Sequence, residues 1–494
     1  MKRRLAVGEQ QVETLRYAVR MRAISKYSGQ LCIVLGILSL VPCGISVLFG
    51  EHRLTLAYFL AALGLSVFGL ILSRIKAPSL IQPNEALVIT AFIFFFSALI
   101  WAVPMTMSGL SFMDAFFEAV SGITTTGLST LQTVEGLSLT LLFVRSWLQW
   151  IGGLGIVVLT VAILTGPGVT ARHLVNIEES EDIVGSTRLY TRTVLKVYGA
   201  MTVLGFLLLL SLRLDWFSAI TYTFSAVSTG GFAIHDSSLA ALPSWHVRAA
   251  ILFLSLCGAV SLASYYRAYR QGWRTIIEDL QIRYLVFFTI AVTFLLGISM
   301  HVLTGLSLKE TVSNAPLMAA TAQTTAGFST LNVEGLDRAS KLILITSMAI
   351  GGGLGSTAGG IKIIRTLILF SMLKLLVKRT GMPLHAVTQT TVGKNRLADE
   401  EIQRVLLIII LFISVIAVSW LPFLAAGFDP LDSLFEVVSA IGTVGLSTGI
   451  SSRDLPTFLK GVLCIDMLMG RVEILAYLVF FYPGTWIGRR IKIS

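Results

Sequence analysis

The chain has 494 residues, of which 55% are hydrophobic and only 13% are charged. A soluble domain carries about 25% charged residues, so this composition excludes an ordinary soluble protein and predicts one that crosses a membrane many times. The net charge of +11 is concentrated in particular loops rather than on one face, which indicates membrane topology and argues against nucleic-acid binding.

The N-terminal part of the chain precedes any repeated pattern. Residues 1–28 form a basic segment that is too long and too polar for a cleaved signal peptide, and it predicts a cytoplasmic N-terminus. Residues 29–78 contain two apolar stretches, at about 30–50 and 55–75, where we expect a transmembrane hairpin. At about 20 apolar residues per helix, the whole chain has room for about ten membrane-spanning helices.

From residue 79 onwards, the sequence predicts one structural unit repeated four times, at 79–175, 176–275, 276–395 and 396–494. Each unit has a long apolar helix, a short half-helix, a glycine loop and a second long helix. The first helices are expected at 86–107, 193–214, 280–303 and 401–425, the half-helices at 112–122, 216–226, 311–321 and 431–440, and the second helices at 140–164, 246–267, 341–378 and 458–482. We therefore predict an all-α polytopic membrane protein, in which an N-terminal hairpin precedes four membrane–pore-loop–membrane repeats around a pseudo-fourfold pore.

A short pattern of Thr, any residue, Gly and then Leu or Phe follows each half-helix, at intervals of about 100 residues. In the fourth repeat it reads Thr443-Val444-Gly445, like the start of the Thr-Val-Gly-Tyr-Gly loop whose carbonyl oxygens coordinate K⁺ in channels. Glycine turns that merely cap short helices would not require the Thr. The candidate K⁺ filter residues are Thr124, Thr125, Gly127, Ser228, Thr229, Gly230, Gly231, Thr324, Thr325, Ala326, Gly327, Gly442, Thr443, Val444 and Gly445.

The second long helix of the third repeat contains six glycines between positions 351 and 360. Each glycine disfavours a helix by about 1 kcal/mol, so we expect the helix to break there, beneath the filters. We interpret the break as a flap that gates the pore, because close helix packing needs only a few glycines on one face. The run is not a phosphate-binding loop, since Ile361 separates Gly360 from Lys362 and no strand precedes it. The candidate gate residues are Gly351, Gly352, Gly353, Gly355, Ser356, Thr357, Gly359, Gly360, Lys362 and Arg471.

Charged residues within predicted spans mark functional positions, because they are costly in lipid. Arg471 lies in the last long helix, and we expect it to donate hydrogen bonds to carbonyl groups freed by the broken helix and to place positive charge in the cation path. A local pair with Glu473 is disfavoured, since residues i and i+2 do not share a helix face. Asp466 and Lys362 have three possible roles: they pair with each other, line the inner vestibule or reach the membrane surface.

Acidic residues recur on the half-helices as well. Glu118 and Glu436 occupy the same position of two half-helices, where we expect them to support the filter from behind rather than to contact the ion. Asp114 and Asp432 stand near the starts of the same two helices, where we expect their side chains to accept hydrogen bonds from free N–H groups. The loops between repeats are basic, which predicts that both termini are cytoplasmic and that the filters open outward.

These motifs resemble the Trk/Ktr/HKT superfamily of potassium transporters, and the TrkH type of potassium-translocating subunit most closely. The resemblance covers nearly the whole chain. Besides the four filters it rests on three segments, Gln149-Trp150-Ile151-Gly152-Gly153-Leu154-Gly155, Gly355-Ser356-Thr357-Ala358-Gly359-Gly360-Ile361-Lys362 and Gly470-Arg471-Val472-Glu473. The sequence departs from the family pattern at the extra glycine, Gly230, and in the segment 258–262, where relatives often have an asparagine.

The resemblance implies a potassium uptake subunit of the inner membrane, with K⁺ as the transported ion and no cofactor bound by this chain. It implies a homodimer, surrounded by lipid, that docks on a cytoplasmic ring of nucleotide-binding RCK subunits of the TrkA type. In HKT relatives a serine at the position of Gly127 accompanies sodium preference, so Gly127 favours potassium. The broken helix and Arg471 match the family's intramembrane gate and its latch.

Two classes of function remain open at this point. A gated, channel-like pathway for potassium uptake fits the four filters best. A cation-coupled secondary transporter, a K⁺ or Na⁺ symporter, would use the broken helix for alternating access, but such proteins usually have two inverted repeats. An enzyme has no support, because no span carries a His, Asp and Glu cluster with metal-site spacing.

Overall fold

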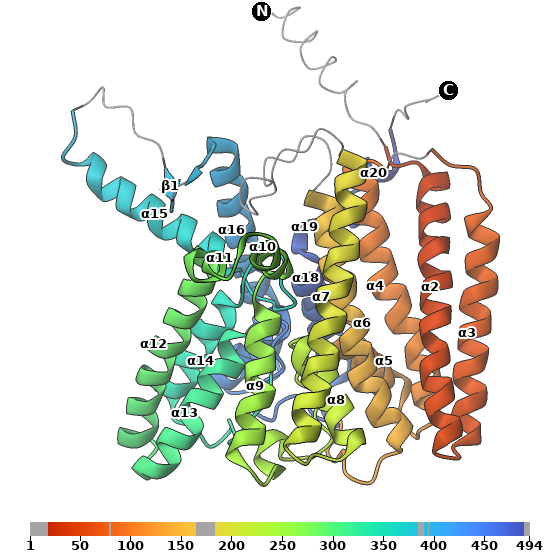
Figure 1. Ribbon diagram of the computed structural model, residues 1–494, viewed down its shortest axis with the longest axis horizontal. Helices are drawn as coiled ribbons and strands as arrows, with labels where there is room; N and C mark the ends of the chain where they lie inside the picture. Colours follow the sequence, from red (N-terminus) through yellow and green to blue (C-terminus); the bar gives the residue numbers. More distant parts are fainter. Residues whose placement is uncertain (1–17, 79–80, 165–182, 384–389, 394, 489–494) are drawn as a thin grey trace, which may run out of the picture.

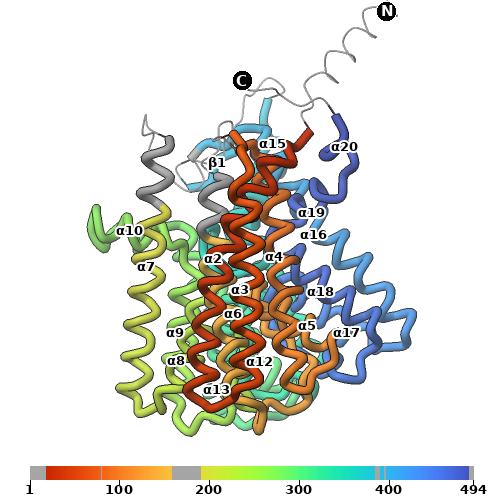
Figure 2. The backbone as a smooth tube through the Cα atoms, turned by 90° about the vertical axis from the view of Figure 1, so that its right-hand side faces the viewer, coloured from red at the N-terminus to blue at the C-terminus, as the bar shows by residue number. Residues whose placement is uncertain are grey.

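The computed structural model describes residues 18–78, 81–164, 183–383, 390–393 and 395–488, and it is predominantly helical (Figure 1). The basic residues of segment 1–17, Arg172 and the C-terminal stretch 489–492, on which part of the predicted topology rests, lie outside the described residues. Figures 1 and 2 place the short helices α5, α8 and α13 in the half of the molecule opposite α20, and Figure 2 places α17 there as well. We call their end the filter side and the opposite end the terminal side.

The predicted N-terminal hairpin consists of α2 (Met21–Leu48) and α3 (His52–Ser73), at one edge of the molecule (Figure 1). The two helices approach closely at glycines, because a Cβ atom built on Gly69 would lie 2.6 Å from the carbonyl oxygen of Gly29. Small residues at such crossings are typical of membrane helices, which lack a hydrophobic driving force for association. The hairpin packs against α4 of the first repeat.

Four repeats follow the hairpin and confirm the predicted fold class. The first has α4 (Pro83–Thr106), α5 (Phe112–Ile123) and α6 (Leu139–Leu164); the second has α7 (Ile183–Ser211), α8 (Trp216–Val227), the 3₁₀ helix η2 (Ser238–Ala241), α9 (Trp245–Ala259) and α10 (Leu262–Gln271). After α11 (Arg274–Glu278), the third has α12 (Leu280–Val302), α13 (Leu308–Gln323), α14 (Arg338–Ile350) and α15 (Ile363–Arg379). An antiparallel pair, β1 (Thr391–Val392) and β2 (Asn395–Arg396), precedes the fourth repeat, which has α16 (Asp399–Ala425), α17 (Pro430–Ile441), α18 (Thr457–Val472), α19 (Ile474–Phe481) and α20 (Pro483–Trp486).

Within the described residues, seven helices are long and apolar enough to cross a membrane, or eight if α9 and α10 count as one bent span. Fewer uninterrupted helices appear than the ten expected, because the second long helix is continuous only in the first repeat. The chain is a multi-pass membrane protein whose remaining crossings are made of broken helices.

The break predicted in the third repeat is confirmed, since α14 ends at Ile350 and α15 begins at Ile363. The prediction that the helices at 246–267 and 458–482 are continuous is wrong. In the second repeat, α9 and α10 meet at 84° because Val260 and Ser261 have non-helical backbone angles. In the fourth repeat, α18 and α19 are separated at Glu473, whose φ of 73° no right-handed helix contains.

The two ends of the described chain meet on the terminal side. The N–H group of Val19 donates to the carbonyl oxygen of Thr485 over 2.9 Å. Next to it, Arg20 forms a buried ion pair with Glu85 at the start of α4, with 2.7 Å between Nε and Oε1. Because a buried carboxylate is costly without a partner, this pair fixes the entry of the hairpin against the first repeat.

Candidate ion pathway

The four predicted filter loops meet in one closed ring. Each filter glycine lies so close to the next loop that an added Cβ atom would collide with the carbonyl oxygen of the residue before that loop's glycine. The pairs are Gly127 with Gly230, Gly231 with Ala326, Gly327 with Val444, and Gly445 with Thr126. The order runs from the first repeat through the fourth and back to the first, so the loops surround a common axis.

All four loops share one unusual backbone conformation. The filter threonines have positive φ angles, of 53° at Thr125, 52° at Thr229, 53° at Thr325 and 48° at Thr443. The glycines two residues later also have positive φ, of 91°, 81°, 72° and 96° in chain order, whereas the residues between have negative φ. Alternation of this kind turns successive carbonyl groups to the same side of the chain, which is how a filter lines a pore with oxygens.

In all four repeats, an equivalent backbone hydrogen bond joins the loop to the end of its half-helix. The N–H group of the residue before the filter glycine donates to the carbonyl of the Ser or Thr five residues earlier, for example from Thr126 to Ser121 over 2.9 Å and from Val444 to Ser439 over 2.8 Å. The hydroxyl groups of these two serines also accept from the N–H groups of Gly127 and Gly445, both over 3.0 Å. The hydroxyl contact therefore adds a second bond to the loop in the first and fourth repeats, whereas Ser225 and Thr321 at the same position of the other two repeats contribute only their backbone carbonyls.

Two glutamates brace the outer ends of the first and fourth loops, as predicted. Glu118 accepts hydrogen bonds from the Ser129 hydroxyl over 2.6 Å and the Thr130 N–H over 3.0 Å. Glu436 accepts from the hydroxyl of Ser447 and, over 3.0 Å, from the N–H of Thr448. Both carboxylates are fully buried behind the loops, so they fix the loop rather than coordinate an ion.

Arg145 is a component that the sequence did not reveal. This buried residue of α6 donates from Nε to Glu118 over 2.9 Å, and its guanidinium lies 4.0 Å from the ring centroid of Phe232, next to the second filter glycine. It therefore joins the first filter to the second. Its position within an apolar helical run was the only available signal.

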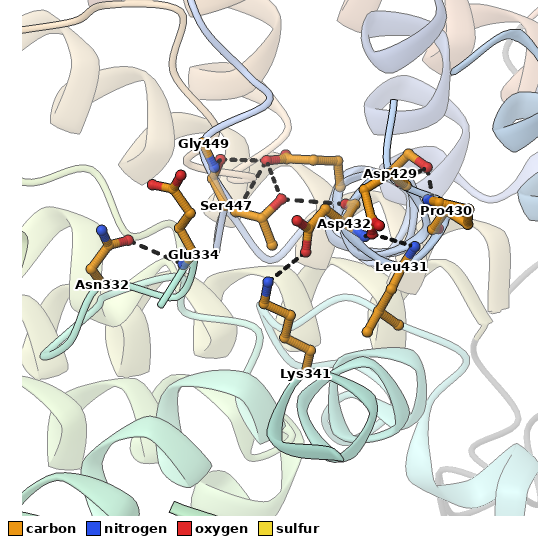
Figure 3. Close-up of polar contacts among 12 residues, drawn as sticks. Asn332, Glu334, Lys341, Asp429, Pro430, Leu431, Asp432, Ser447 and Gly449 are labelled. Atoms are coloured by element: carbon orange, nitrogen blue, oxygen red, sulfur yellow. Dashed lines mark hydrogen bonds and ion pairs between the residues drawn. The ribbon is translucent and has the colours of Figure 1, made fainter. Parts of the chain in front are cut away.

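Asp114 and Asp432 lie in the first turn of their half-helices, as predicted, but the prediction that they accept hydrogen bonds from free backbone N–H groups is wrong. The caps are Ser111 and Asp429, which accept from the backbone N–H groups of the first turn. Asp432 instead pairs with Lys341 over 2.6 Å, as Figure 3 shows.

Asp114 pairs with Lys460 over the same distance, 2.6 Å. In both cases the lysine stands on the second long helix of one repeat, and the aspartate on the half-helix of the next. The two pairs therefore hold neighbouring repeats together on the filter side.

The segment 351–362 between α14 and α15 lies directly against the filters. We call it the flap. The N–H group of Gly359 donates to the hydroxyl of Thr325 over 2.7 Å, and the hydroxyl groups of Thr229 and Thr357 lie 3.4 Å apart. A Cβ atom on Gly359 would collide with the hydroxyl of Thr443. The flap thus contacts filter threonines of the second, third and fourth repeats from the terminal side.

The break in the second repeat holds the flap in place. With no helical continuation, the carbonyl groups of Gly258 and Ala259 accept hydrogen bonds from the flap N–H groups of Thr357, over 3.1 Å, and Gly353, over 3.0 Å. The side-chain amide of Gln323, at the end of α13, donates to the carbonyl of Gly351 over 2.7 Å. The 84° bend therefore supplies the polar partners that irregular backbone needs at membrane depth.

Arg471 donates a hydrogen bond to a carbonyl group of the broken helix, as predicted. Its Nη1 donates to the carbonyl of Thr357 over 2.6 Å, and its Nη2 donates to the carbonyl of Gly152 in α6 over 3.2 Å. The side chain is buried, with 5% exposure. Glu473 pairs with Arg365 of α15 instead, over 2.5 Å. Arg471 thus bridges the fourth repeat, the flap and the first repeat.

Lys362 and Asp466 do not form a pair with each other. Lys362 ends the flap with a φ of 85°, and its ammonium group donates to the carbonyl of Ala358. Asp466 is fully buried and accepts from the hydroxyl of Ser419 on α16 over 2.6 Å. Lys362 therefore belongs to the flap, whereas Asp466 faces a neighbouring helix.

Within the described parts of the chain, no three His, Cys, Asp or Glu side chains come together as a metal site would require. The oxygens that the filters offer to a cation are backbone carbonyls and threonine hydroxyls. Such oxygens suit a monovalent cation, because they can replace the water molecules of its hydration shell.

A ring of four pore loops above a broken helix defines the class: a multi-pass membrane protein built to pass a cation. The chain belongs to the TrkH family of cation transport proteins, whose family model matches residues 84–485.

Two kinds of relative are similar to nearly the whole chain. An uncharacterised cation transporter of Methanocaldococcus jannaschii is 31% identical over 92% of this chain and 94% of that protein. The Trk system potassium uptake protein TrkH is 29% identical in Halomonas elongata, over 94% of this chain and 99% of that protein, and 29% identical in Escherichia coli K12, over 95% and 100%. The crystal structure of the potassium transporter TrkH from Vibrio parahaemolyticus has the same fold, with a TM-score of 0.85 over 95% of this chain and 100% of that chain at 24% identity.

Proposed function

We propose that this chain takes up K⁺ across the cell membrane through a gated, channel-like filter. The observation that carries the proposal is the closed ring in which each filter glycine contacts the next loop's carbonyl oxygen. The names of the relatives support potassium as the ion, since those of Halomonas elongata and Escherichia coli are potassium uptake proteins.

The ion would lose its water at the carbonyl rings and be stabilised by the half-helices. The C-terminal ends of α5, α8, α13 and α17 run directly into the filters. Helix C-termini carry partial negative charge, which favours a cation on the axis. The membrane potential supplies about 2.3 kcal/mol per charge for each 100 mV, so uptake requires no chemical step in this chain.

The flap is the gate in this proposal, and Arg471 is its latch. The flap contacts three filter threonines and Arg471 adds positive charge on the same side, so the arrangement corresponds to a closed pathway. Opening requires the Arg471–Thr357 bond to break and the flap to move away from the axis.

The terminal side is the cytoplasmic side in this proposal, and the membrane is the inner membrane. Exposed basic residues there, Arg270, Arg274, Lys374 and Lys378, fit the positive-inside rule. They also offer a docking surface to a nucleotide-binding RCK subunit beneath a homodimer of this chain. The family's Trk system names, which imply further components, support such a partner.

Rescue of a potassium-uptake-deficient bacterium at low potassium tests the function. We expect the parent chain to restore growth. Gly127→Ser should abolish the preference for potassium, because Gly127 has a φ of 91° and lies against the carbonyl of Gly230, so a side chain must distort the ring. A parent chain that expresses in the membrane but gives no potassium flux would refute the proposal.

The broken helices of three repeats favour a second candidate, a cation-coupled symporter that alternates access. Voltage-clamp currents separate the two. A channel-like pathway gives currents that do not depend on a proton or sodium gradient, whereas a symporter requires one.

A further inference from the structure

Gln149 clamps the second filter from the first repeat. This fully buried residue of α6 donates from Nε2 to the carbonyl oxygen of Gly230 over 2.5 Å, and its Oε1 accepts from the N–H group of Phe232 over 3.1 Å. The orientation of the amide is fixed, because only its oxygen can accept from Phe232. The side chain therefore bonds to the backbone on both sides of the filter glycine, Gly231.

The same contact explains the extra glycine of the second filter. Gly230 has a negative φ, so its conformation does not require glycine. The limited space around Gly230 does require glycine, because a Cβ atom there would lie 2.4 Å from Cδ and 2.6 Å from Oε1 of Gln149. The other repeats have Thr126, Ala326 and Val444 at this position.

The fourth loop has an apolar residue, Val444, at the position of Gly230. Val444 packs in one apolar cluster with Met348, which stands on the second long helix of the preceding repeat. Within the described residues, the second filter is thus the loop whose ring carbonyl is tied by a glutamine side chain.

We propose that Gln149 is a positioning residue that sets the ion preference of the filter. The carbonyl of Gly230 belongs to the ring, since it is the group that Gly127 contacts. An amide that donates to this oxygen draws away part of its electron density and holds it at a fixed distance from the axis. The ring then adapts poorly to an ion smaller than K⁺, so the clamp disfavours Na⁺. This inference rests on the proposed function and deepens it.

Potassium and sodium flux into liposomes that contain the full chain tests the role of Gln149. Gln149→Met keeps the length of the side chain but removes both hydrogen bonds. We expect the ratio of potassium to sodium flux to fall about fivefold, which corresponds to the net contribution of one ordinary hydrogen bond. An unchanged ratio in a folded variant would overturn the inference while leaving the proposed function intact. Absence of potassium flux both from the parent chain and from the chain lacking residues 351–360 would instead refute the proposed function.

Gln323→Met is the matched control, because Gln323 is also a buried glutamine but donates to the flap at Gly351. We expect it to change the rate of flux and to leave the ratio as in the parent. If it lowers the ratio equally, the effect belongs to the loss of any buried amide, and the inference fails.

A paired substitution separates space from hydrogen bonding. Gly230→Ala alone should reduce flux, since the added Cβ meets Gln149. The double variant Gln149→Ala with Gly230→Ala should restore flux, because the added methyl group enters the space left by the Gln149 side chain. Its ratio of potassium to sodium flux should nevertheless stay as low as in Gln149→Met. Recovery of both flux and ratio in the double variant would contradict the role of the amide.

Discussion

At the residue scale, the filters hold four threonines in a conformation that β-branched residues avoid. Their φ angles of 48° to 53° lie in the left-handed region. Such residues cost about 1–3 kcal/mol each and persist only where the surrounding structure imposes them. Hydrogen bonds to the half-helix and contact with the next loop impose it here. The strain is therefore localised at the oxygens that an ion would meet.

The buried pair of Arg145 and Glu118 gives a first prediction at this scale. Arg145→Met leaves the carboxylate of Glu118 buried without its cation, and we expect a loss of about 3–5 kcal/mol of stability together with loss of flux. Thermal unfolding in detergent measures it. Arg145→Met with Glu118→Gln should lose less than Arg145→Met alone. The control Arg453→Met, at an exposed arginine on the filter side, should stay within about 0.5 kcal/mol of the parent.

Asp337, the cap of α14 on the filter side, gives a prediction about pH. Burial would raise the pKa of Asp337, but hydrogen bonds from Ser340, Thr304 and Ser299 outweigh it and lower the pKa to about 2. An aspartate in an unfolded chain has a pKa of about 3.9, so the carboxylate stabilises the fold above that pH and loses this effect as the pH falls towards 2.

Asp337→Asn keeps a capping oxygen but removes its charge, and it should cost about 1–2 kcal/mol at pH 7, because hydrogen bonds to a charged acceptor are stronger than those to a neutral one. The difference from the parent should shrink below pH of about 4, measured by unfolding at a series of pH values. A difference that stays constant down to pH of about 3 would contradict the assignment to the carboxylate charge.

At the element scale, the second long helices of three repeats are broken, and the breaks complement each other. Carbonyl groups left free at the end of α9 accept hydrogen bonds from the flap, and Arg471 of α18 completes the contact. No single helix contains these interactions. The conformation of the flap therefore depends on contacts with the second and fourth repeats as well as with its own.

Deleting most of the flap tests the gate. Deletion of residues 351–360 should raise potassium flux into liposomes in the absence of any partner, because the contacts with the filter threonines are lost. Arg471→Met, which removes only the latch, should raise flux by a smaller factor. Flux that stays at the level of the parent in both variants, with the protein still folded, would rule out a gate.

At the scale of the whole molecule, the repeats are linked in a ring by contacts between neighbours. Lys341 of the third repeat pairs with Asp432 of the fourth, and Lys460 of the fourth pairs with Asp114 of the first. The filter contacts run in the same order. A pore with one axis follows from this closure, although all four loops belong to one chain.

The proposed orientation is open to a direct test. A green fluorescent protein fused after residue 494 should fluoresce and an alkaline phosphatase fused there should be inactive, because the terminal side is expected in the cytoplasm. The reverse pattern should appear for fusions in the loop after Gly136, on the filter side. Active phosphatase at the C-terminus would invert the proposed direction of the filters.

The sequence by itself determined the repeats, the half-helices, the filter loops and the break at the flap. These depend on local features: apolar run length, the Thr-x-Gly pattern and glycine density. Tertiary structure decided the rest. The bends at Val260 and Glu473, the ion pairs between repeats and the contacts of Arg145 and Gln149 are absent from the sequence pattern. Each depends on which residues from distant parts of the chain satisfy a buried polar group, and only the closed ring brings those residues together.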